Sequence, residues 1–277
     1  MIELCDLTKT FGDFTAVDSL DLRIETGEFF GLLGPNGAGK TTTISMMSTV
    51  LLPTRGEVRI DGELLTRKAS EQKRKLSVIT QEYSMRQDMN MEEVMEYQGR
   101  LYRLPRRTIR EKTDELLEFA GLSEYRRRTV RHLSGGMKRK LMICRALMID
   151  PEILLLDEPT AGMDALSRRQ MWNLLRRVNG NKMTIVLTTH YMEEAQALCD
   201  RVALINRGQL QKLDAPEALI RELGAWAVDE TSDKDLVSRY FHEREEAIAH
   251  LSAASSDAAL RATTLEDVFV DCAGRKL

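Results

Sequence analysis

The alternation of apolar and polar positions predicts strands and turns in the first third of the chain. Ile2–Leu7 and Leu20–Ile24 alternate with the two-residue period of a half-buried strand. Glu28–Leu33 is a short, mostly apolar run that leads directly into a glycine-rich loop. Two further strands are predicted, one at Glu57–Ile60 ahead of an Asp-Gly turn and one at Leu76–Thr80.

The middle of the chain, Met91–Met148, is charged and has the period of helices, with Leu116, Leu117 and Ala120 about one turn apart. Within it, Arg100–Lys140 contains 13 Lys and Arg residues against 5 Asp and Glu, a local charge of +8. This excess favours a solvated helical face. The alternative is a contact with an acidic partner surface or with anionic lipid headgroups.

Short apolar strands alternate with helices over the next part of the chain. We predict strands at Ile153–Leu156 and Thr184–Thr188, helices at Ala165–Val178 and Met192–Leu198, and a hairpin of Val202–Ile205 with Gln209–Leu213. Apolar strands that alternate with helices are typical of a parallel sheet covered on both faces. The sequence therefore predicts an α/β fold.

The remainder, from about Gly224, is acidic, rich in alanine and less clearly patterned. Near its end, Leu265, Val268, Phe269 and Cys272 have helical spacing, and Thr264 is placed as the cap of that helix. We interpret this tail as a small packed extension and not as a second enzyme.

Length and composition limit the classes of protein. With 277 residues, the chain has room for one large domain, or one domain and a small appendage. The net charge of −3 argues against a strongly basic nucleic-acid binder, and 43% apolar residues argue against disorder. We expect no membrane-spanning segment, no secretory signal and, with four widely spaced cysteines, neither a disulfide framework nor a zinc site.

A phosphate-binding loop is predicted directly after the strand that ends at Leu33. The loop reads Gly34-Pro35-Asn36-Gly37-Ala38-Gly39-Lys40-Thr41 and fits the pattern G-x-x-x-x-G-K-[ST], and we assign the following Thr42 to the same nucleotide-binding set. Glycines allow backbone N–H groups to turn toward phosphate oxygens, and the helix that follows directs its positive end at the same anion. Lys40 can reach the outer phosphates, and Thr41 can bind Mg²⁺. The alternative is an ordinary glycine-rich turn.

Two carboxylates, Asp157 and Glu158, follow the apolar strand Ile153–Leu156. Ligands of a parallel sheet bind at the carboxyl ends of its strands. We therefore expect Asp157 to hold Mg²⁺ through water beside the phosphate loop. Glu158 is the candidate to orient or deprotonate an attacking water. A charged turn after a strand is the alternative.

Upstream of these carboxylates stands the segment Leu133-Ser134-Gly135-Gly136-Met137. With the two motifs above, it resembles the signature of ABC transporter ATP-binding subunits. Serine and glycine amides at a helix start can form a second anion site. The resemblance implies that Ser134, Gly135 and Gly136 bind the γ-phosphate of an ATP held by another protomer.

Other elements of this family follow in the expected order. The resemblance implies that Gln81 joins Mg²⁺, that Asp164 in Ala161-Gly162-Met163-Asp164 lies at the dimer interface, that His190 is the switch histidine and that Phe11 stacks on adenine. Taken alone, His190 is more often structural, and Phe11 could be a core residue. The sequence has Phe11 where the family more often has tyrosine, and Met137 where many relatives have glutamine.

The resemblance implies a P-loop NTPase core of RecA-like type with an antiparallel β subdomain and an inserted helical subdomain. We expect an ATP-binding domain over residues 1–223, with the helical subdomain at about 82–150, and a C-terminal extension over 224–277. The implied function is that of an ATPase. Two copies close around two Mg-ATP molecules and power a separate membrane permease at the cytoplasmic face of the membrane, with no nucleic-acid partner.

Three segments further resemble exporters of the ABC-2 multidrug and polysaccharide subgroup. They are Ser134–Arg139, Thr189–Ala195 and Thr264–Phe269. The alternatives are an importer ATPase or a soluble ABC ATPase that is not coupled to transport. A P-loop kinase or GTPase would leave the segment Leu133–Met137 unexplained.

Overall fold

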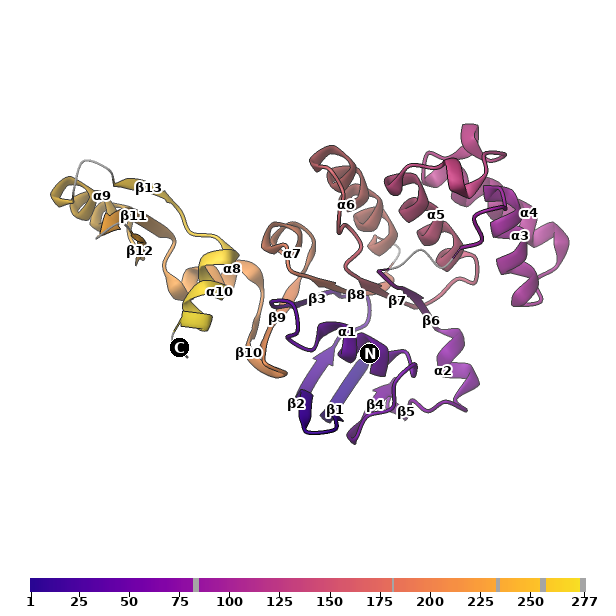
Figure 1. The fold of residues 1–277 in the computed structure, drawn as a ribbon, viewed down its shortest axis with the longest axis horizontal. Helices are drawn as coiled ribbons and strands as arrows, with labels where there is room; N and C mark the ends of the chain where they lie inside the picture. The colour runs from indigo at the N-terminus through magenta and orange to yellow at the C-terminus, as the bar shows by residue number, and fades with distance from the viewer. Residues whose placement is uncertain (82–84, 181, 233–234, 255–257, 275–277) are drawn as a thin grey trace.

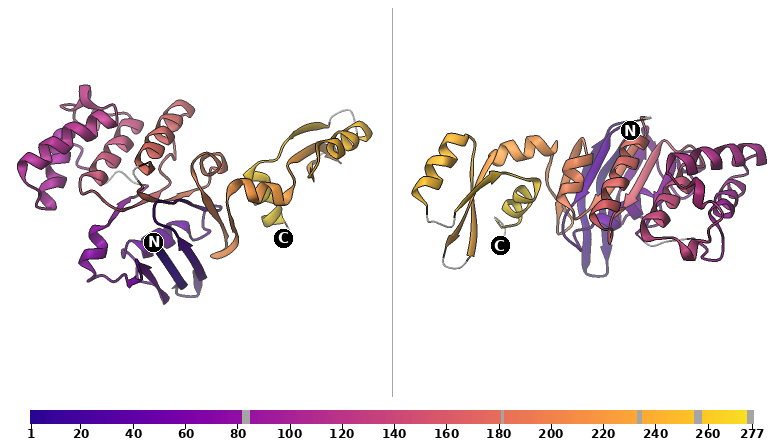
Figure 2. Two further views of the ribbon diagram at one scale, coloured as in Figure 1. Left: turned by 180° about the vertical axis from the view of Figure 1, so that it is seen from behind. Right: turned by 90° about the horizontal axis from the view of Figure 1, so that it is seen from above.

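The computed structural model describes residues 1–81, 85–180, 182–232, 235–254 and 258–274. In this part of the chain, strands form a six-stranded sheet, a four-stranded antiparallel sheet and a three-stranded sheet. Figure 1 shows the antiparallel sheet below the six-stranded sheet, and helices α5, α6 and α7 above it. Figure 2 shows that the C-terminal elements project from one end of the molecule and that α3 and α4 lie at the other.

The six-stranded sheet has the order β10-β9-β3-β8-β7-β6, in which β9, β3, β8, β7 and β6 run parallel and β10 is antiparallel to β9. Its strands are β3 (Phe29–Leu33), β6 (Leu76–Ile79), β7 (Ile153–Asp157), β8 (Thr184–Thr189), β9 (Arg201–Asn206) and β10 (Gln209–Asp214). Neighbouring side chains of a strand point to opposite faces, and both faces are covered. Leu154 accordingly packs in one core and Leu155 in the other, which explains why this strand is apolar at every position before its terminal carboxylate.

The antiparallel sheet closes the second core. It has the order β2-β1-β4-β5, with β1 (Ile2–Phe11), β2 (Phe14–Ile24), β4 (Arg55–Ile60) and β5 (Glu63–Leu64). Helix α1 (Lys40–Met47) lies between the two sheets, with Ile44, Met46 and Met47 buried among their side chains. Both β1 and β2 extend further than the sequence pattern predicts, and irregularities in their pairing interrupt the alternation of side chains on which that prediction rests.

The predicted helical insertion occupies the chain between β6 and β7. It contains α3 (Met91–Leu101), α4 (Arg106–Phe119), the short 3₁₀ helices η1 (Ser123–Tyr125) and η2 (Val130–His132), and α5 (Gly135–Leu147). A capping box begins α3, where Asn90 and Glu93 each accept a hydrogen bond from the other's backbone N–H. The apolar faces of these helices share one core with α6 (Ala165–Asn179), so the insertion packs on the upper face of the sheet.

The remaining described helices before the extension are α2 (Ser70–Arg74), α7 (Met192–Leu198) and α8 (Pro216–Leu223). The bounds of α7 are those predicted from the sequence. None of the described helices combines the length and the apolar content that a membrane crossing requires.

The C-terminal segment contains a sheet of its own. Its elements are β11 (Trp226–Ser232), β12 (Asp235–Phe241), α9 (Arg244–Ala253), β13 (Ala259–Ala262) and α10 (Leu265–Gly274), with the strand order β12-β11-β13. Helix α10 returns to pack beside α7 and α8, where Leu265 and Val268 are fully buried. The predicted boundary at residue 224 falls between α8 and β11, and we propose it as the domain boundary.

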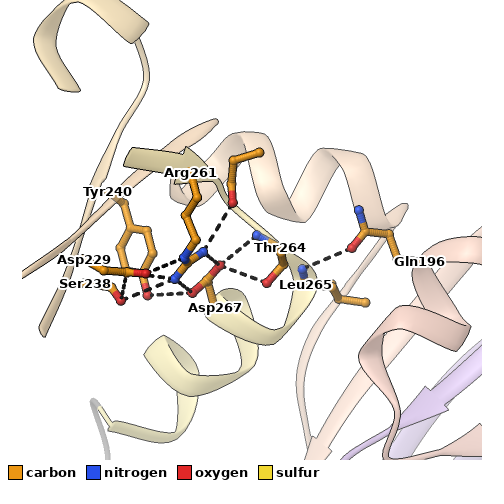
Figure 3. A network of polar contacts seen from close by, with 9 residues as sticks. Gln196, Asp229, Ser238, Tyr240, Arg261, Thr264, Leu265 and Asp267 are labelled. Carbon is orange, nitrogen blue, oxygen red and sulfur yellow. Dashed lines mark hydrogen bonds and ion pairs between the residues drawn. The ribbon is translucent and has the colours of Figure 1, made fainter. Parts of the chain in front are cut away.

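A network around Arg261 joins the three-stranded sheet to the start of α10 (Figure 3). The Arg261 guanidinium donates to both carboxylate oxygens of Asp229, at 2.7 and 3.0 Å, and to both of Asp267, at 2.7 and 2.8 Å. The Asp267 carboxylate also accepts from the backbone N–H and the hydroxyl of Thr264. The helix start predicted at Thr264 is thus capped, with Asp267 as the acceptor.

The same network shifts the pKa values of its carboxyl groups. Hydrogen bonds from Arg261 lower the pKa of Asp229, whereas burial would raise the pKa of Asp267 and hydrogen bonds from Arg261 and Thr264 more than offset it. Both native pKa values are lower than the ordinary 3.8, so the ionised carboxylates stabilise the folded state. This contribution to folding stability is complete above the unfolded-state pKa and is lost as the pH falls through the lowered values.

Arg261→Met is expected to destabilise the C-terminal extension by roughly 1–3 kcal/mol at pH 7, because the buried Asp267 carboxylate and the largely buried Asp229 carboxylate lose their charged donor. Hydrogen exchange should show faster opening of β11, β13 and α10, and unchanged protection in β3 and β8. The control is Arg239→Met, which removes an exposed ion pair with Glu230 on the same sheet. Equal protection of α10 in wild type and Arg261→Met would contradict this role.

Candidate functional site

The glycine-rich loop connects the end of β3 to α1, as the sequence predicts. Gly39 has a φ of +102° immediately before the helix, and a Cβ there would lie 2.4 Å from the Ala16 carbonyl oxygen. A Cβ on Gly34 would lie 2.2 Å from the carbonyl oxygen of Ile205. Glycine is therefore required at both positions by close backbone approach, and the loop wraps the N-terminal end of α1.

Lys40, the first residue of α1, directs its ammonium group back into the loop. Its side chain is only 4% exposed and donates to the carbonyl oxygens of Gly34 (2.9 Å) and Pro35 (3.0 Å). Burial lowers the pKa of Lys40, while the nearby charges of Glu158 and Asp157 raise it and so oppose this shift. The loop therefore holds a buried cation at the positive end of a helix, an arrangement that favours anion binding.

Asp157 lies at the end of β7 and is buried directly behind the loop. Its Oδ1 accepts hydrogen bonds from the hydroxyl of Thr41 on α1 (3.1 Å) and from that of Thr188 on β8 (2.5 Å). These two contacts join three elements that the sheet topology brings together. The position expected for Asp157, beside the phosphate loop, is the one observed.

Glu158, the next residue, has a left-handed backbone with a φ of +48°. Its N–H donates to the carbonyl and the hydroxyl oxygens of Thr188, both at 3.1 Å. Its Oε1 lies 3.2 Å from Nδ1 of His190 and 3.9 Å from Nζ of Lys40. The carboxylate, the imidazole and the ammonium group thus converge, although the three residues follow different strands.

A cleft of about 560 Å³ opens in front of these groups. The predicted residues that line it are Phe11, Asn36, Gly37, Gly39, Lys40, Thr41, Thr42, Gln81, Glu158 and His190. Gly34 and Pro35 line an adjoining hollow with His190, whereas Ala38 is buried in the loop and donates its N–H to Pro35. The structure therefore gathers the loop, the glutamine, the glutamate and the histidine around one space.

Two aromatic side chains stand at the mouth of this cleft. Phe11 is 47% exposed and Phe14, its partner across the β1–β2 hairpin, is 61% exposed. The alternative that Phe11 is a core residue is therefore wrong. An exposed pair of rings beside a phosphate-binding loop is suited to stacking on a planar base.

Ser134, Gly135, Gly136 and Asp164 are not among the described residues that line the cleft. Ser134 caps α5 by accepting from the N–H of Met137, and Asp164 caps α6 by accepting from the N–H and the hydroxyl of Ser167. A Cβ built on Gly136 would lie 3.6 Å from the Ser167 hydroxyl, so these two helix starts are neighbours. The signature and Asp164 thus form a second polar surface of the chain.

The oxygen donors beside the loop are of the kind that would suit a magnesium ion. Among the described residues, no group of three or more His, Cys, Asp or Glu side chains could hold a metal. The oxygen atoms available are the Thr41 hydroxyl, the Asp157 carboxylate and the Gln81 amide. Mg²⁺ is commonly held by few protein oxygens together with phosphates and waters, so this donor set suits it.

Sequence reasoning missed three residues of the site. Phe14 could have been found from its place beside the predicted Phe11 turn, and Thr188 from its position at a strand end. Arg139 ends the segment Ser134–Arg139 quoted above, but its residue type does not reveal the bonds that it makes. Its side chain is buried, yet it donates to the backbone carbonyl oxygens of Thr80 (2.7 Å) and Gln81 (3.1 Å).

Comparison with known proteins agrees with this geometry. Residues 17–161 match the model of a family described as ABC transporter. The chain is 34% identical to the daunorubicin resistance ATP-binding protein DrrA3 of Streptomyces coeruleorubidus, over 96% of this chain and 93% of that protein. It is 36% identical to the Nod factor export ATP-binding protein I of Cupriavidus metallidurans, over 100% and 98% of the two chains.

Solved structures with the same fold are ATP-binding cassettes. One is the dimer of a cassette in a post-hydrolysis state bound to ADP and Pi, with a TM-score of 0.69 and 27% identity over 78% of this chain and 98% of that one. Another is cbiO1 from Clostridium perfringens, with a TM-score of 0.74 and 25% identity over 80% and 90%. Both support a P-loop fold.

Lys40→Ala is expected to weaken nucleotide binding by about one to two decades and to remove most ATP hydrolysis, because the buried cation of the loop is lost. The measurement is a fluorescent-nucleotide titration together with the steady-state rate. Lys68→Ala, which removes an exposed lysine far from the loop, is the control. Turnover at the wild-type rate in Lys40→Ala would refute the assignment.

Proposed function

We propose that two copies of this chain close around two Mg-ATP molecules to power export through a separate permease. The premise is that the chain belongs to the ABC transporter family and is an ATP-hydrolysing subunit of it. Two full-length relatives are named for daunorubicin resistance and Nod factor export, which favours an exporter over an importer or an uncoupled ATPase. Subunits of this family pair with a transmembrane permease. We place this one at the cytoplasmic face of the membrane, held by that permease.

The observation that carries the proposal is the separation of two anion-binding surfaces on one chain. The cleft holds Lys40 and Glu158, whereas Ser134, at the start of α5, is not among the described residues that line it. A chain with two half-sites is completed by a second copy related by two-fold symmetry. Each ATP would then lie between the loop of one copy and Ser134, Gly135 and Gly136 of the other.

Each residue of the cleft has a role that its geometry supports. Lys40 and the loop amides bind the outer phosphates, and Phe11 with Phe14 holds the base. Thr41, Asp157 and Gln81 hold Mg²⁺, which supplies charge neutralisation at the phosphates when bound. Glu158 accepts the proton of the attacking water, and His190, 3.2 Å from its carboxylate, keeps that carboxylate oriented.

The permease is proposed to dock on the face of α3 and α4. Tyr97, Leu101 and Tyr102 are exposed there, and Arg106 and Arg110 line a shallow hollow beside them. Glu92 and Glu96 line the same hollow, so the face is mixed in charge. Exposed apolar side chains beside arginines suit the loops of a membrane protein near anionic headgroups. Over residues 91–119 as a whole, 6 Lys and Arg residues are balanced by 7 Asp and Glu, so the positive charge of this face is confined to the arginines of Arg100–Arg110, of which Arg100 and Arg107 pair with Glu96 and Glu111.

Glu158→Gln should bind ATP, hydrolyse it about 10²–10⁴-fold more slowly and accumulate as a dimer, because the amide keeps the shape of the carboxylate but not its basicity. ATP held between two copies stabilises their association for as long as its γ-phosphate remains. Size-exclusion chromatography with Mg-ATP distinguishes the two states. If Glu158→Gln stays monomeric, or dimerises equally well when Ser134→Arg is added, the signature does not complete the site of the other copy.

Reversing Arg106 and Arg107 to Glu should weaken assembly with the permease, and more so at low salt, while ATP affinity stays at the wild-type value. Co-purification with the permease at two ionic strengths measures the effect. The matched control reverses Arg67 and Lys68, two exposed cations between β5 and α2. Equal assembly of both variants would show that the basic stretch is only a solvated face.

A further inference from the structure

Arg139 is a buried cation whose guanidinium donates hydrogen bonds to backbone carbonyl groups. Its side chain is 2% exposed. The guanidinium donates from Nη1 to the Thr80 carbonyl at 2.7 Å, and from Nη2 to the Gln81 carbonyl at 3.1 Å and the Glu158 carbonyl at 3.4 Å. Burial of a guanidinium is costly unless its donors are satisfied, and these bonds give both terminal nitrogen atoms an acceptor.

The three carbonyl groups belong to two neighbouring strand ends. Strands β6 and β7 pair in parallel, with Ile79 opposite Leu156, so the backbone that follows each strand emerges at the same edge of the sheet. One of these loops carries Gln81 and the other carries Glu158. A single guanidinium therefore spans the two loops that hold the proposed magnesium ligand and the proposed base.

Arg139 also fixes the backbone of Glu158, whose φ of +48° is unfavourable for a non-glycine residue. Thr188 accepts the hydrogen bond from the Glu158 N–H. On the other side, the Glu158 carbonyl accepts from the N–H of Ala161 at 3.2 Å and from Arg139. The strained turn is thus held at both ends, and one of the restraints comes from α5.

Helix α5 is the element that begins with the signature, and Arg139 lies little more than one turn after Ser134. Under the proposed function, the start of α5 contacts the ATP held by the partner copy, whereas Gln81 and Glu158 act on the ATP held by this chain. The helix that senses one nucleotide is therefore bonded to the loops that act on the other.

Resting on the proposed function, we propose that Arg139 is a positioning residue that couples the two ATP sites of the dimer. A planar guanidinium with several fixed donors can hold both loops at once, which a single ammonium group cannot do with the same geometry. ATP bound at the signature of one copy then orients Gln81 and Glu158 of that same copy. Loss of this link leaves nucleotide binding intact, slows hydrolysis and removes cooperativity between the sites.

The test compares Arg139→Met with wild type in the full chain, using ATP titrations of the hydrolysis rate and binding of a fluorescent ATP analogue. Nucleotide affinity should stay within about threefold, whereas kcat should fall about 10–100-fold, because misplacement of a base by about 1 Å has an effect of that size. The Hill coefficient for ATP should fall to that of independent sites. Lys140→Met is the matched control, since Lys140 is the next residue on α5 and bonds Gln170 on α6 instead.

Arg139→Lys covers the case in which the methionine variant fails to fold. It keeps the buried charge, and it should unfold at the wild-type temperature, bind nucleotide normally and still lose at least about tenfold in kcat. Wild-type kcat and cooperativity in Arg139→Lys would overturn the proposal, as would losses of affinity and kcat in equal proportion. Absence of hydrolysis in the wild-type chain would instead contradict the proposed function itself.

Discussion

Parallel pairing of buried strands is the constraint on which the site depends. Because β3, β6, β7 and β8 run in the same direction, their carboxyl ends meet at one edge of the sheet. Each end delivers one part of the site: the phosphate loop, Gln81, the pair Asp157-Glu158 and His190. The strands are covered on both faces, so packing of the core fixes the positions of these groups before any nucleotide binds.

The charged side chains at this edge of the sheet are stabilised by a small number of hydrogen bonds and ion pairs. Lys40 is held by two loop carbonyls, Asp157 by two hydroxyls, and the Glu158 carboxylate lies between Lys40 and His190. A buried charge stays charged only if such partners offset its desolvation. When a nucleotide binds, its outer phosphates are therefore expected to replace the loop carbonyl groups as the hydrogen-bond acceptors of Lys40.

Much of the core and of the cleft was predictable, because the relevant signals are local. Apolar runs such as Ile153–Leu156 predict buried strands directly, and the loop before Lys40 has the residue types and the strand–helix context that a phosphate-binding loop requires. The three-stranded sheet was not predicted. Its strands carry Asp229, Arg239 and Arg261 and are held partly by ion pairs, which leave no alternating pattern. Arg139 was missed as a site residue, although it lies in the quoted segment Ser134–Arg139, because its hydrogen bonds to backbone carbonyl groups leave no pattern in the sequence.

Dimer closure with the signature acting on the partner's ATP is the central claim, and mixing two inactive variants tests it most directly. Copies with Lys40→Ala and copies with Ser134→Arg each lack a working site as homodimers. In a mixed dimer, the intact loop of one copy meets the intact signature of the other. The account predicts that equal mixing restores ATPase activity that neither variant has alone, with a ceiling of about a quarter of the wild-type rate, because half of the dimers are mixed and each has one intact site. The coupling through Arg139 lowers the rate below that ceiling, since the copy with the intact loop carries the altered signature. A mixture as inactive as its components would contradict it.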